Sequence, residues 1–198
     1  MRAYECVLLD SAAEQVQAAG VAARALRDNP VAMAISADPL LRLEMPYSFF
    51  HSQMADTSSV TAAARLGHYV LAAAGAAPPG KCVGSMIAEE MRSMSAPLEG
   101  ASDEDRLVYS GCVMASNDLP EPHWHVGPVG VEPGLQSMGI GKRVMEVLCN
   151  ELDRRSGVGW LETDKPENVR FYAGLGFELV QEAPMLAAKF WFMRRDPR

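Results

Sequence analysis

The clearest periodicity in the chain lies between residues 139 and 155, where apolar positions recur with a helical repeat. Ile140, Val144, Val147, Leu148 and Leu152 stand at i, i+4, i+7, i+8 and i+12, which places them on one helical face. The pattern predicts an amphipathic helix over Gly139–Arg155.

Shorter apolar runs predict strands on both sides of this helix. One run ends at Val131, and Val158–Thr163 is typical of a short strand. The segment Ala187–Arg194 predicts a final strand, with Phe190 and Phe192 on one face and Trp191 on the other.

The first half of the chain has a weaker pattern. Ser11 followed by Glu14 is typical of a capping box, and Asn29-Pro30 would stop the helix that it begins. The elements predicted here are a strand at Ala3–Leu9, a helix at Ser11–Arg27, a loop or short helix at Ser36–Pro46, a second helix at Ser48–Arg65, and a hairpin of Tyr69–Ala74 and Lys81–Ile87 with its turn at Gly75–Gly80.

The segment Glu89–Glu121 is long, rich in Met, Ser and charge, and without clear periodicity. Its acidic run Asp103-Glu104-Asp105 is typical of a solvated face, and the alternative is a role in attracting a cationic substrate. No internal repeat or linker divides the chain, so we expect a single domain over residues 1–198.

The segment between the apolar run and the long helix predicts an anion site. A turn on Pro133 and Gly134 is followed by Gln136-x-x-Gly139-x-Gly141, which opens into the helix. The first N–H groups of a helix have no intrahelical partner, and glycines let an anion approach the backbone. The segment lacks the Ser or Thr of a P-loop after Lys142 and the third glycine of a dinucleotide-binding turn at Val144.

A second motif, together with this segment, resembles the signature of a known protein family. Asn168-Val-Arg-Phe-Tyr172-Ala-Gly-Leu-Gly176-Phe177 resembles the Asn-x-x-x-Tyr-x-x-x-Gly-Phe signature of the GCN5-related N-acetyltransferase (GNAT) superfamily. The Gln136–Gly141 pattern resembles the acetyl-CoA loop of the same superfamily, and the two motifs occur in its order. The resemblance covers residues 120–182, with an N-terminal half at 1–119 and a final strand in 183–198.

The resemblance implies an α+β fold: a mixed, mostly antiparallel sheet of six or seven strands with helices on both faces. Strands four and five would splay apart after Val131 and Thr163, and acetyl-CoA would bind between them. Acetyl-CoA is the cosubstrate, and we expect no metal. The cofactor-binding residues that the resemblance implies are Val129, Gly130, Val131, Gln136, Met138, Gly139, Ile140, Gly141, Lys142 and Asn168.

The resemblance also implies a general acid. Tyr172 would lie beside the cofactor sulfur and protonate the departing thiolate. The pKa values match the task, since a phenol titrates near 10 and a thiol near 8.5. The alternative is a tyrosine of a helix face that packs in the core.

The general base is open between three candidates. His123 and His125 alternate with Trp124 in the strand before Val131 and share one of its faces. His125 lies where some members carry a catalytic carboxylate, and an imidazole titrates in the useful range. Glu162, with Asp164 nearby, and a water chain are the alternatives. A His-x-His pair can also bind a metal, but no third ligand is evident in the neighbouring sequence.

Composition limits the partners. The net charge of −7 argues against general nucleic-acid binding and favours a neutral or cationic acceptor. No apolar stretch is long enough to span a membrane, and the four scattered cysteines indicate reduced thiols in a cytoplasmic protein. Homodimerisation stays open.

We therefore expect an acetyl-CoA-dependent N-acetyltransferase that acts on a primary amine of a small molecule or peptide. The transfer would be direct, because no cysteine lies in the loop or strands that flank the expected cleft. Two alternatives stay open: a non-catalytic sensor of acyl-CoA, and an enzyme of resistance to an amine-bearing antibiotic or toxin.

Overall fold

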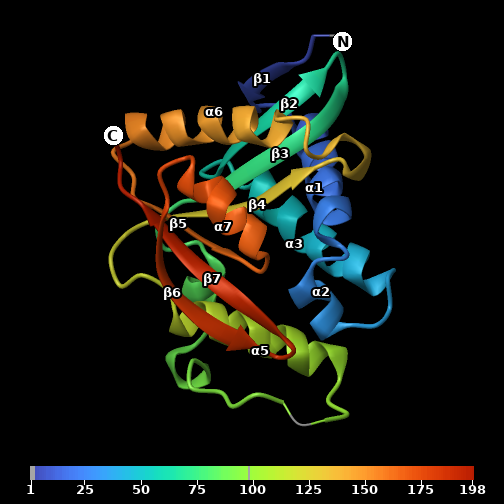
Figure 1. The fold of residues 1–198 in the computed structure, drawn as a ribbon, viewed down its shortest axis with the longest axis vertical. Coiled ribbons are helices and arrows are strands. Elements are labelled where there is room, and N and C mark those ends of the chain that lie inside the picture. Colours follow the sequence, from blue (N-terminus) through green and yellow to red (C-terminus); the bar gives the residue numbers. More distant parts are fainter. Residues whose placement is uncertain (1–2, 98) are drawn as a thin grey trace.

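A computed structural model describes residues 3–97 and 99–198 (Figure 1). One seven-stranded mixed sheet runs through the molecule in the order β1-β2-β3-β4-β5-β7-β6. The strands are β1 (Glu5–Leu8), β2 (Val60–Leu66), β3 (Tyr69–Ala77), β4 (Trp124–Val131), β5 (Gly159–Thr163), β6 (Glu178–Met185) and β7 (Ala188–Arg195). All neighbours are antiparallel except β4 and β5. The expected α+β class and strand number are thus confirmed.

Helices cover both faces of this sheet (Figure 1). They are α1 (Ala12–Leu26), α2 (Pro30–Ile35), α3 (Leu41–Ala55), α4 (Val83–Met86), α5 (Asp103–Ser116), α6 (Ile140–Arg154) and α7 (Pro166–Ala173), with short 3-10 turns at Glu89–Met91 and Pro133–Leu135. Helix α6 packs on β1, β2 and β3, while α1 packs on the opposite face of β3 and β4. No helix in the described ranges is long and apolar enough to cross a membrane.

The central strands are built from alanine. Ala62, Ala64, Ala72 and Ala74 face α6, and Ala63 and Ala73 face α1. Small side chains on both faces let the two helices approach the sheet closely. The sequence prediction of one helix over Ser48–Arg65 is wrong here: α3 ends at Ala55, and the alanine-rich run that follows is β2. Burial on two faces overrides the helix propensity of alanine.

The predicted hairpin is wrong for a related reason. Strand β3 continues to Ala77 and pairs with β2, and the turn between them lies at Gly67, whose φ of 61° suits glycine. Residues Lys81–Ile87 contain α4 instead of a strand. The loop or short helix expected at Ser36–Pro46 gives way to α3, which begins at Leu41 and contains Pro46.

Two expected details of the helices differ as well. Ser11 precedes α1 but its side chain caps no N–H group, and Glu14 forms an ion pair with Arg65 at 2.8 Å. The real capping box is at Ser102 and Asp105, where the acidic run begins α5. Negative charge at a helix N-terminus is favourable, which gives this run a structural use.

The region around the glycine-rich motif agrees with the prediction. Helix α6 spans Ile140–Arg154 and buries Val144, Leu148 and Leu152. Strand β5 begins one residue later than expected, at Gly159, and β7 is shifted by one residue. Phe190 and Phe192 are buried together with Trp160, as their alternation with Trp191 predicts.

Candidate active site

Strands β4 and β5 separate to form a cleft. They pair only at Trp124 with Gly159 and at His125 with Trp160. The separation therefore begins after His125 and Trp160, earlier than the expected points at Val131 and Thr163. A cavity of about 510 Å³ opens at this gap, and its walls include His125, Glu162, Asn168 and Tyr172.

One edge of β4 faces this gap. Residues Val129, Gly130 and Val131 pair with β3 on one side, at Ala74, Ala73 and Ala72. In the described ranges no strand pairs with them on the other side. This leaves backbone groups on that edge for a ligand that lies along the strand. Position 130 also requires glycine, because a Cβ there would lie 2.9 Å from Ala22 of α1.

The glycine-rich turn places the N-terminus of α6 beside β4. Gly139 precedes the helix with φ 78°, which glycine adopts without strain, and no side chain caps the first N–H groups. At Gly141 a Cβ would lie 3.2 Å from Val131. The Gln136 side chain donates to the Val131 carbonyl at 3.3 Å and so ties the turn to the strand.

The flanking side chains of this turn point to different surroundings. Met138 is half exposed, and Lys142 is exposed with Glu146 at 3.8 Å from its ammonium. The guanidinium of Arg143 lies over the Tyr4 ring at 4.6 Å, away from the turn. Of the two cations Lys142 and Arg143, Lys142 is therefore the one that remains available to an anion. Ile140 is buried and holds the helix on the core.

Tyr172 lies on α7 and lines the cleft. Its ring packs edge-on against Phe171 and Phe177 and is almost fully buried. Burial raises the pKa of the Tyr172 hydroxyl, and the carboxylates of Glu162 and Asp164 raise it further. The hydroxyl therefore keeps its proton at neutral pH and can donate it.

Asn168 holds the start of the same helix against β5. Its amide Nδ2 donates to Thr163 Oγ1 at 3.0 Å, and the side chain is half-buried at the cavity wall. The Asp164 carboxylate, by contrast, has a structural role. Its two oxygens accept from Asn29 Nδ2 at 3.0 Å and from the Val31 N–H at 2.9 Å. This carboxylate caps α2, which leaves Glu162 as the pocket carboxylate.

His125 and Glu162 form a pair across the start of the cleft. His125 Nε2 lies 3.1 Å from Glu162 Oε2 and 3.4 Å from Oε1. Burial lowers the pKa of His125, but the Glu162 carboxylate and the Cys82 sulfur outweigh it and raise the pKa to about 10. The role of base that the sequence predicts for His125 needs a neutral imidazole, which a raised pKa disfavours.

The other histidine lies in a second polar group. His123 Nε2 is 2.9 Å from Asp118 Oδ1, and Cys82 Sγ donates to Asp118 Oδ2 at 3.2 Å. Burial raises the pKa of Cys82, but the nearby imidazoles of His123 and His125 and the Ser85 N–H outweigh it and lower the pKa to about 6. Burial lowers the pKa of His123, but Asp118 outweighs it and raises the pKa to about 9.

Cys82 reaches the cleft from outside the glycine-rich loop and the flanking strands, where no cysteine was expected. It precedes α4 and lines the cavity with His125. Sequence reasoning missed both Cys82 and Asp118, because neither belongs to a motif and only the fold brings them to the His-x-His pair. That pair was the one signal that could have prompted a search for distant ligands.

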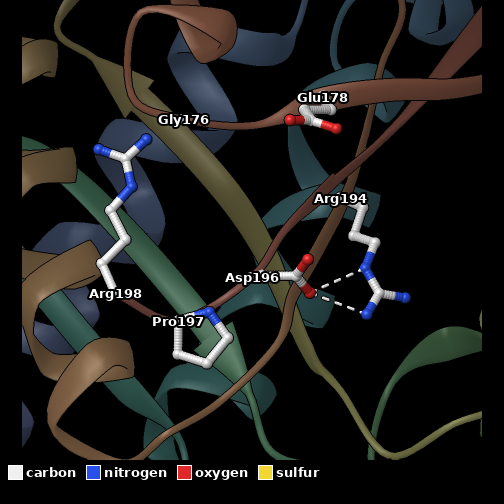
Figure 2. A pocket seen from close by; sticks show the side chains of 6 residues that line it. All are labelled: Gly176, Glu178, Arg194, Asp196, Pro197 and Arg198. Atoms are coloured by element: carbon white, nitrogen blue, oxygen red, sulfur yellow. Dashed lines mark hydrogen bonds and ion pairs between the residues drawn. The ribbon is translucent and has the colours of Figure 1, made fainter.

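A second, smaller hollow lies near the C-terminus (Figure 2). It measures about 190 Å³ and is lined by Gly176, Glu178, Arg194, Asp196, Pro197 and Arg198. Arg194 pairs with Asp196 at 2.8 Å, as the dashed lines in Figure 2 show. Because none of the predicted site residues lies in it, this hollow has no part in the candidate active site.

Known proteins share this architecture. The agmatine N-acetyltransferase structure superposes with a TM-score of 0.71 at 16% identity, over 96% of this chain and 99% of the other. The polyamine N-acetyltransferase of Drosophila melanogaster gives a TM-score of 0.67 at 14% identity, over 97% and 100% of the two chains. A PaiA N-acetyltransferase of Thermoplasma acidophilum, in complex with coenzyme A, gives 0.58 at 9% identity, over 97% and 99%.

The sequence itself matches a family description. The family model of the acetyltransferase (GNAT) family matches residues 38–177, which include β4, the glycine-rich turn and α7. The match covers well over half of the 198 residues. The cleft between β4 and β5, the open N-terminus of α6 and the buried Tyr172 all fall within it. This chain belongs to the GNAT acetyltransferase family and is an N-acetyltransferase by that membership.

Proposed function

We propose that the protein transfers the acetyl group of acetyl-CoA to the primary amine of a small cationic molecule. The observation that carries the proposal is the cavity of about 510 Å³ that joins the unpaired edge of β4 to Tyr172 and Glu162. It would bring an extended cofactor, a proton donor and a carboxylate together in one cavity.

The cofactor would lie along β4. Backbone groups of Val129 and Val131 would pair with the pantetheine arm, and Asn168 would contact it from α7. The N–H groups from Met138 to Lys142 would bind the pyrophosphate, because the N-terminus of α6 carries no capping side chain. The solved relative that holds coenzyme A supports this choice of cofactor.

The acceptor would enter the cavity from the opposite side of the sheet. Apolar side chains of α2, α3 and α5, among them Ile35, Phe49 and Met114, form much of that wall. Such a wall suits the methylene groups of an alkyl amine, and the Glu162 carboxylate suits its ammonium group. The net charge of −7 favours cations, and agmatine and polyamines are the acceptors named for two similar structures.

We assign the proton transfers to two side chains. Glu162 takes a proton from the ammonium group of the acceptor. The N–H of His125 Nε2 holds the Glu162 carboxylate in place. The amine nitrogen then attacks the thioester carbon, while a backbone N–H near Val129 or Gly130 stabilises the oxyanion. When the C–S bond breaks, Tyr172 donates its proton to the sulfur of coenzyme A. The attacking nitrogen loses its second proton as the amide forms, and the Tyr172 phenolate takes a proton back. His125 is thereby a positioning residue, and the base is the alternative carboxylate.

A thiol-release assay with acetyl-CoA tests the proposal. Candidate acceptors are agmatine, polyamines, an aminoglycoside and a peptide with a free N-terminus. Release that depends on agmatine or a polyamine, with the acetylated amine found by mass spectrometry, is the expected result. Binding of coenzyme A without release for any amine would contradict it and support the sensor alternative. Release with the aminoglycoside alone would support the resistance alternative.

A further inference from the structure

Four side chains with metal-binding atoms meet beside the cavity, and two of them, Cys82 and His125, line it. Cys82 precedes α4, Asp118 follows α5, and His123 and His125 stand at the start of β4. One ligand atom of each lies within 4.8 Å of those of the others. We propose that these four residues bind one zinc ion. The proposal does not depend on the identity of the acceptor or on acetyl transfer.

The donor set suits this ion. Zinc in proteins takes thiolate, imidazole and carboxylate ligands in a tetrahedral arrangement. Bonds of about 2.0–2.3 Å place the ligand atoms of such a site about 3.3–3.8 Å apart. No two of the four atoms therefore need to approach by more than about 1.5 Å. All four side chains are buried or half-buried, which distinguishes them from an exposed acidic cluster.

The contacts of His123 are those of a metal ligand. Its Nδ1 lies 2.9 Å from the Glu121 carbonyl oxygen, which can only accept, so Nδ1 carries the hydrogen. Its Nε2 is buried and makes no hydrogen bond, although Asp118 Oδ1 is 2.9 Å away. Two atoms this close need a positive charge between them, which either a proton on Nε2 or a metal ion supplies. A backbone carbonyl that fixes the ring in this way is a common outer partner of zinc-binding histidines.

His125 shows the same division of its two nitrogens. Nε2 faces Glu162, while Nδ1 is buried without any hydrogen-bond partner in the described part of the chain. The side chain of His125 is 12% exposed. A carboxylate on one ring nitrogen and a metal on the other is the arrangement seen in carboxylate–histidine–zinc sites. In this arrangement Glu162 keeps the hydrogen bond from Nε2 that the proposed transfer requires.

The polypeptide leaves room for the remaining two ligands. A Cβ at Gly84 would lie 2.1 Å from Asp118 Oδ2, so this carboxylate rests directly on the glycine backbone. From there Oδ2 reaches Cys82 Sγ at 3.2 Å. With four ligands from the protein the site is closed, as structural zinc sites are. It would join α4 and the loop after α5 to the start of β4, beneath the acceptor cavity.

The test is cobalt and zinc binding by the purified full chain after treatment with a chelator. We expect one Co²⁺ per chain, with the intense visible bands of a tetrahedral site and a sulfur-to-cobalt charge-transfer band, and displacement of Co²⁺ by Zn²⁺. Cys82→Ser should lose the charge-transfer band. Loss of a residue that only hydrogen-bonds to a metal ligand weakens metal binding by roughly 10–100-fold. Because His123 and Asp118 would be ligands themselves, His123→Gln and Asp118→Asn should weaken Co²⁺ binding by at least that factor.

Matched controls are Cys6→Ser and His68→Gln, which remove a cysteine and a histidine outside the cluster. These variants should bind Co²⁺ like the parent. If the cluster variants do not fold, X-ray absorption of the zinc-loaded parent decides the matter: one sulfur neighbour and three lighter ones are expected. Failure of the parent to take up either metal, or a spectrum without sulfur, would overturn the proposal. So would equal Co²⁺ affinity in the cluster and control variants.

Discussion

At the scale of single residues, two side chains in the cleft have separable roles. Tyr172 is buried among aromatic rings and lines the cavity. Glu162 lines the same cavity and contacts His125 Nε2. Their position in one cavity favours a functional explanation for both.

The first prediction concerns the acid. Tyr172→Phe removes only the hydroxyl, so kcat should fall on the order of 10²–10⁴-fold, the usual contribution of a positioned acid. The rise in Tm that coenzyme A produces should stay unchanged, since the ring remains. Tyr109→Phe, at a half-buried tyrosine packed against another cluster, is the control and should keep full activity. Unchanged kcat in both variants would return Tyr172 to a structural role.

The second prediction separates base from positioning residue. Glu162→Gln keeps the shape but cannot take a proton, so kcat should again fall on the order of 10²–10⁴-fold at a fixed pH. His125→Asn should have a smaller effect on kcat, because the carboxylate remains. The exposed Glu167→Gln is the control. A full loss in His125→Asn with little change in Glu162→Gln would reverse the two assignments.

At the scale of elements, local sequence predicted some parts well and others poorly. Helix α6 and its turn follow from strong periodicity and from glycines whose φ or close contacts require them, as at Gly139. Strand β2 was missed because Ala62–Ala64 carries no pattern of its own, and only burial on two sides makes it a strand. The strand β6 has mostly exposed residues and also escaped prediction. The Cys82–Asp118 contact depends on tertiary structure alone.

The third prediction tests the N-terminus of α6. Gly141→Asp adds bulk 3.2 Å from Val131 and negative charge where the pyrophosphate is expected. Coenzyme A should then raise the Tm of the parent and not of the variant, because a ligand stabilises only the state that it binds. Gly134→Asp adds the same charge in open space and is the control. Equal Tm shifts in Gly141→Asp and the parent would place the cofactor elsewhere.

The fourth prediction concerns the join between α6 and β7. Arg195 is buried and pairs with Asp153 through two bonds of 2.7 Å. The Arg195 guanidinium lowers the pKa of Asp153, although burial acts in the opposite direction. Asp153→Asn should lower the free energy of unfolding at neutral pH by about 2–4 kcal/mol, because it leaves Arg195 buried without its counter-ion.

The pH dependence of the stabilisation by the Asp153–Arg195 pair follows from the lowered pKa of Asp153. The stabilisation is present above the unfolded-state pKa of about 3.9 and is lost as the pH falls through the lower folded-state pKa. In urea denaturation, the difference between parent and Asp153→Asn should therefore shrink below about pH 4. The exposed Glu178→Gln is the control and should match the parent. A difference that stays constant down to the lowest pH would contradict this account.

At the scale of the whole molecule, one cavity connects the two halves of the sheet. The expected cofactor side is β4 with the N-terminus of α6 beside it, while β5, α2 and α5 line the side where we place the acceptor. The GNAT motifs predicted the cofactor side, because its expected contacts come from backbone groups and glycine positions that the motifs contain. The acceptor side has no sequence motif, since its side chains come from separate segments that converge only in the fold.

The most direct measurement is steady-state thiol release from acetyl-CoA, with and without a small cationic amine. The account predicts release only when the amine is present, an N-acetylated product, and loss of that activity in Tyr172→Phe and Glu162→Gln. Without the amine there should be no burst of coenzyme A, since transfer is direct. A burst of one equivalent with acetyl found on Cys82, or no amine-dependent release at all, would contradict it.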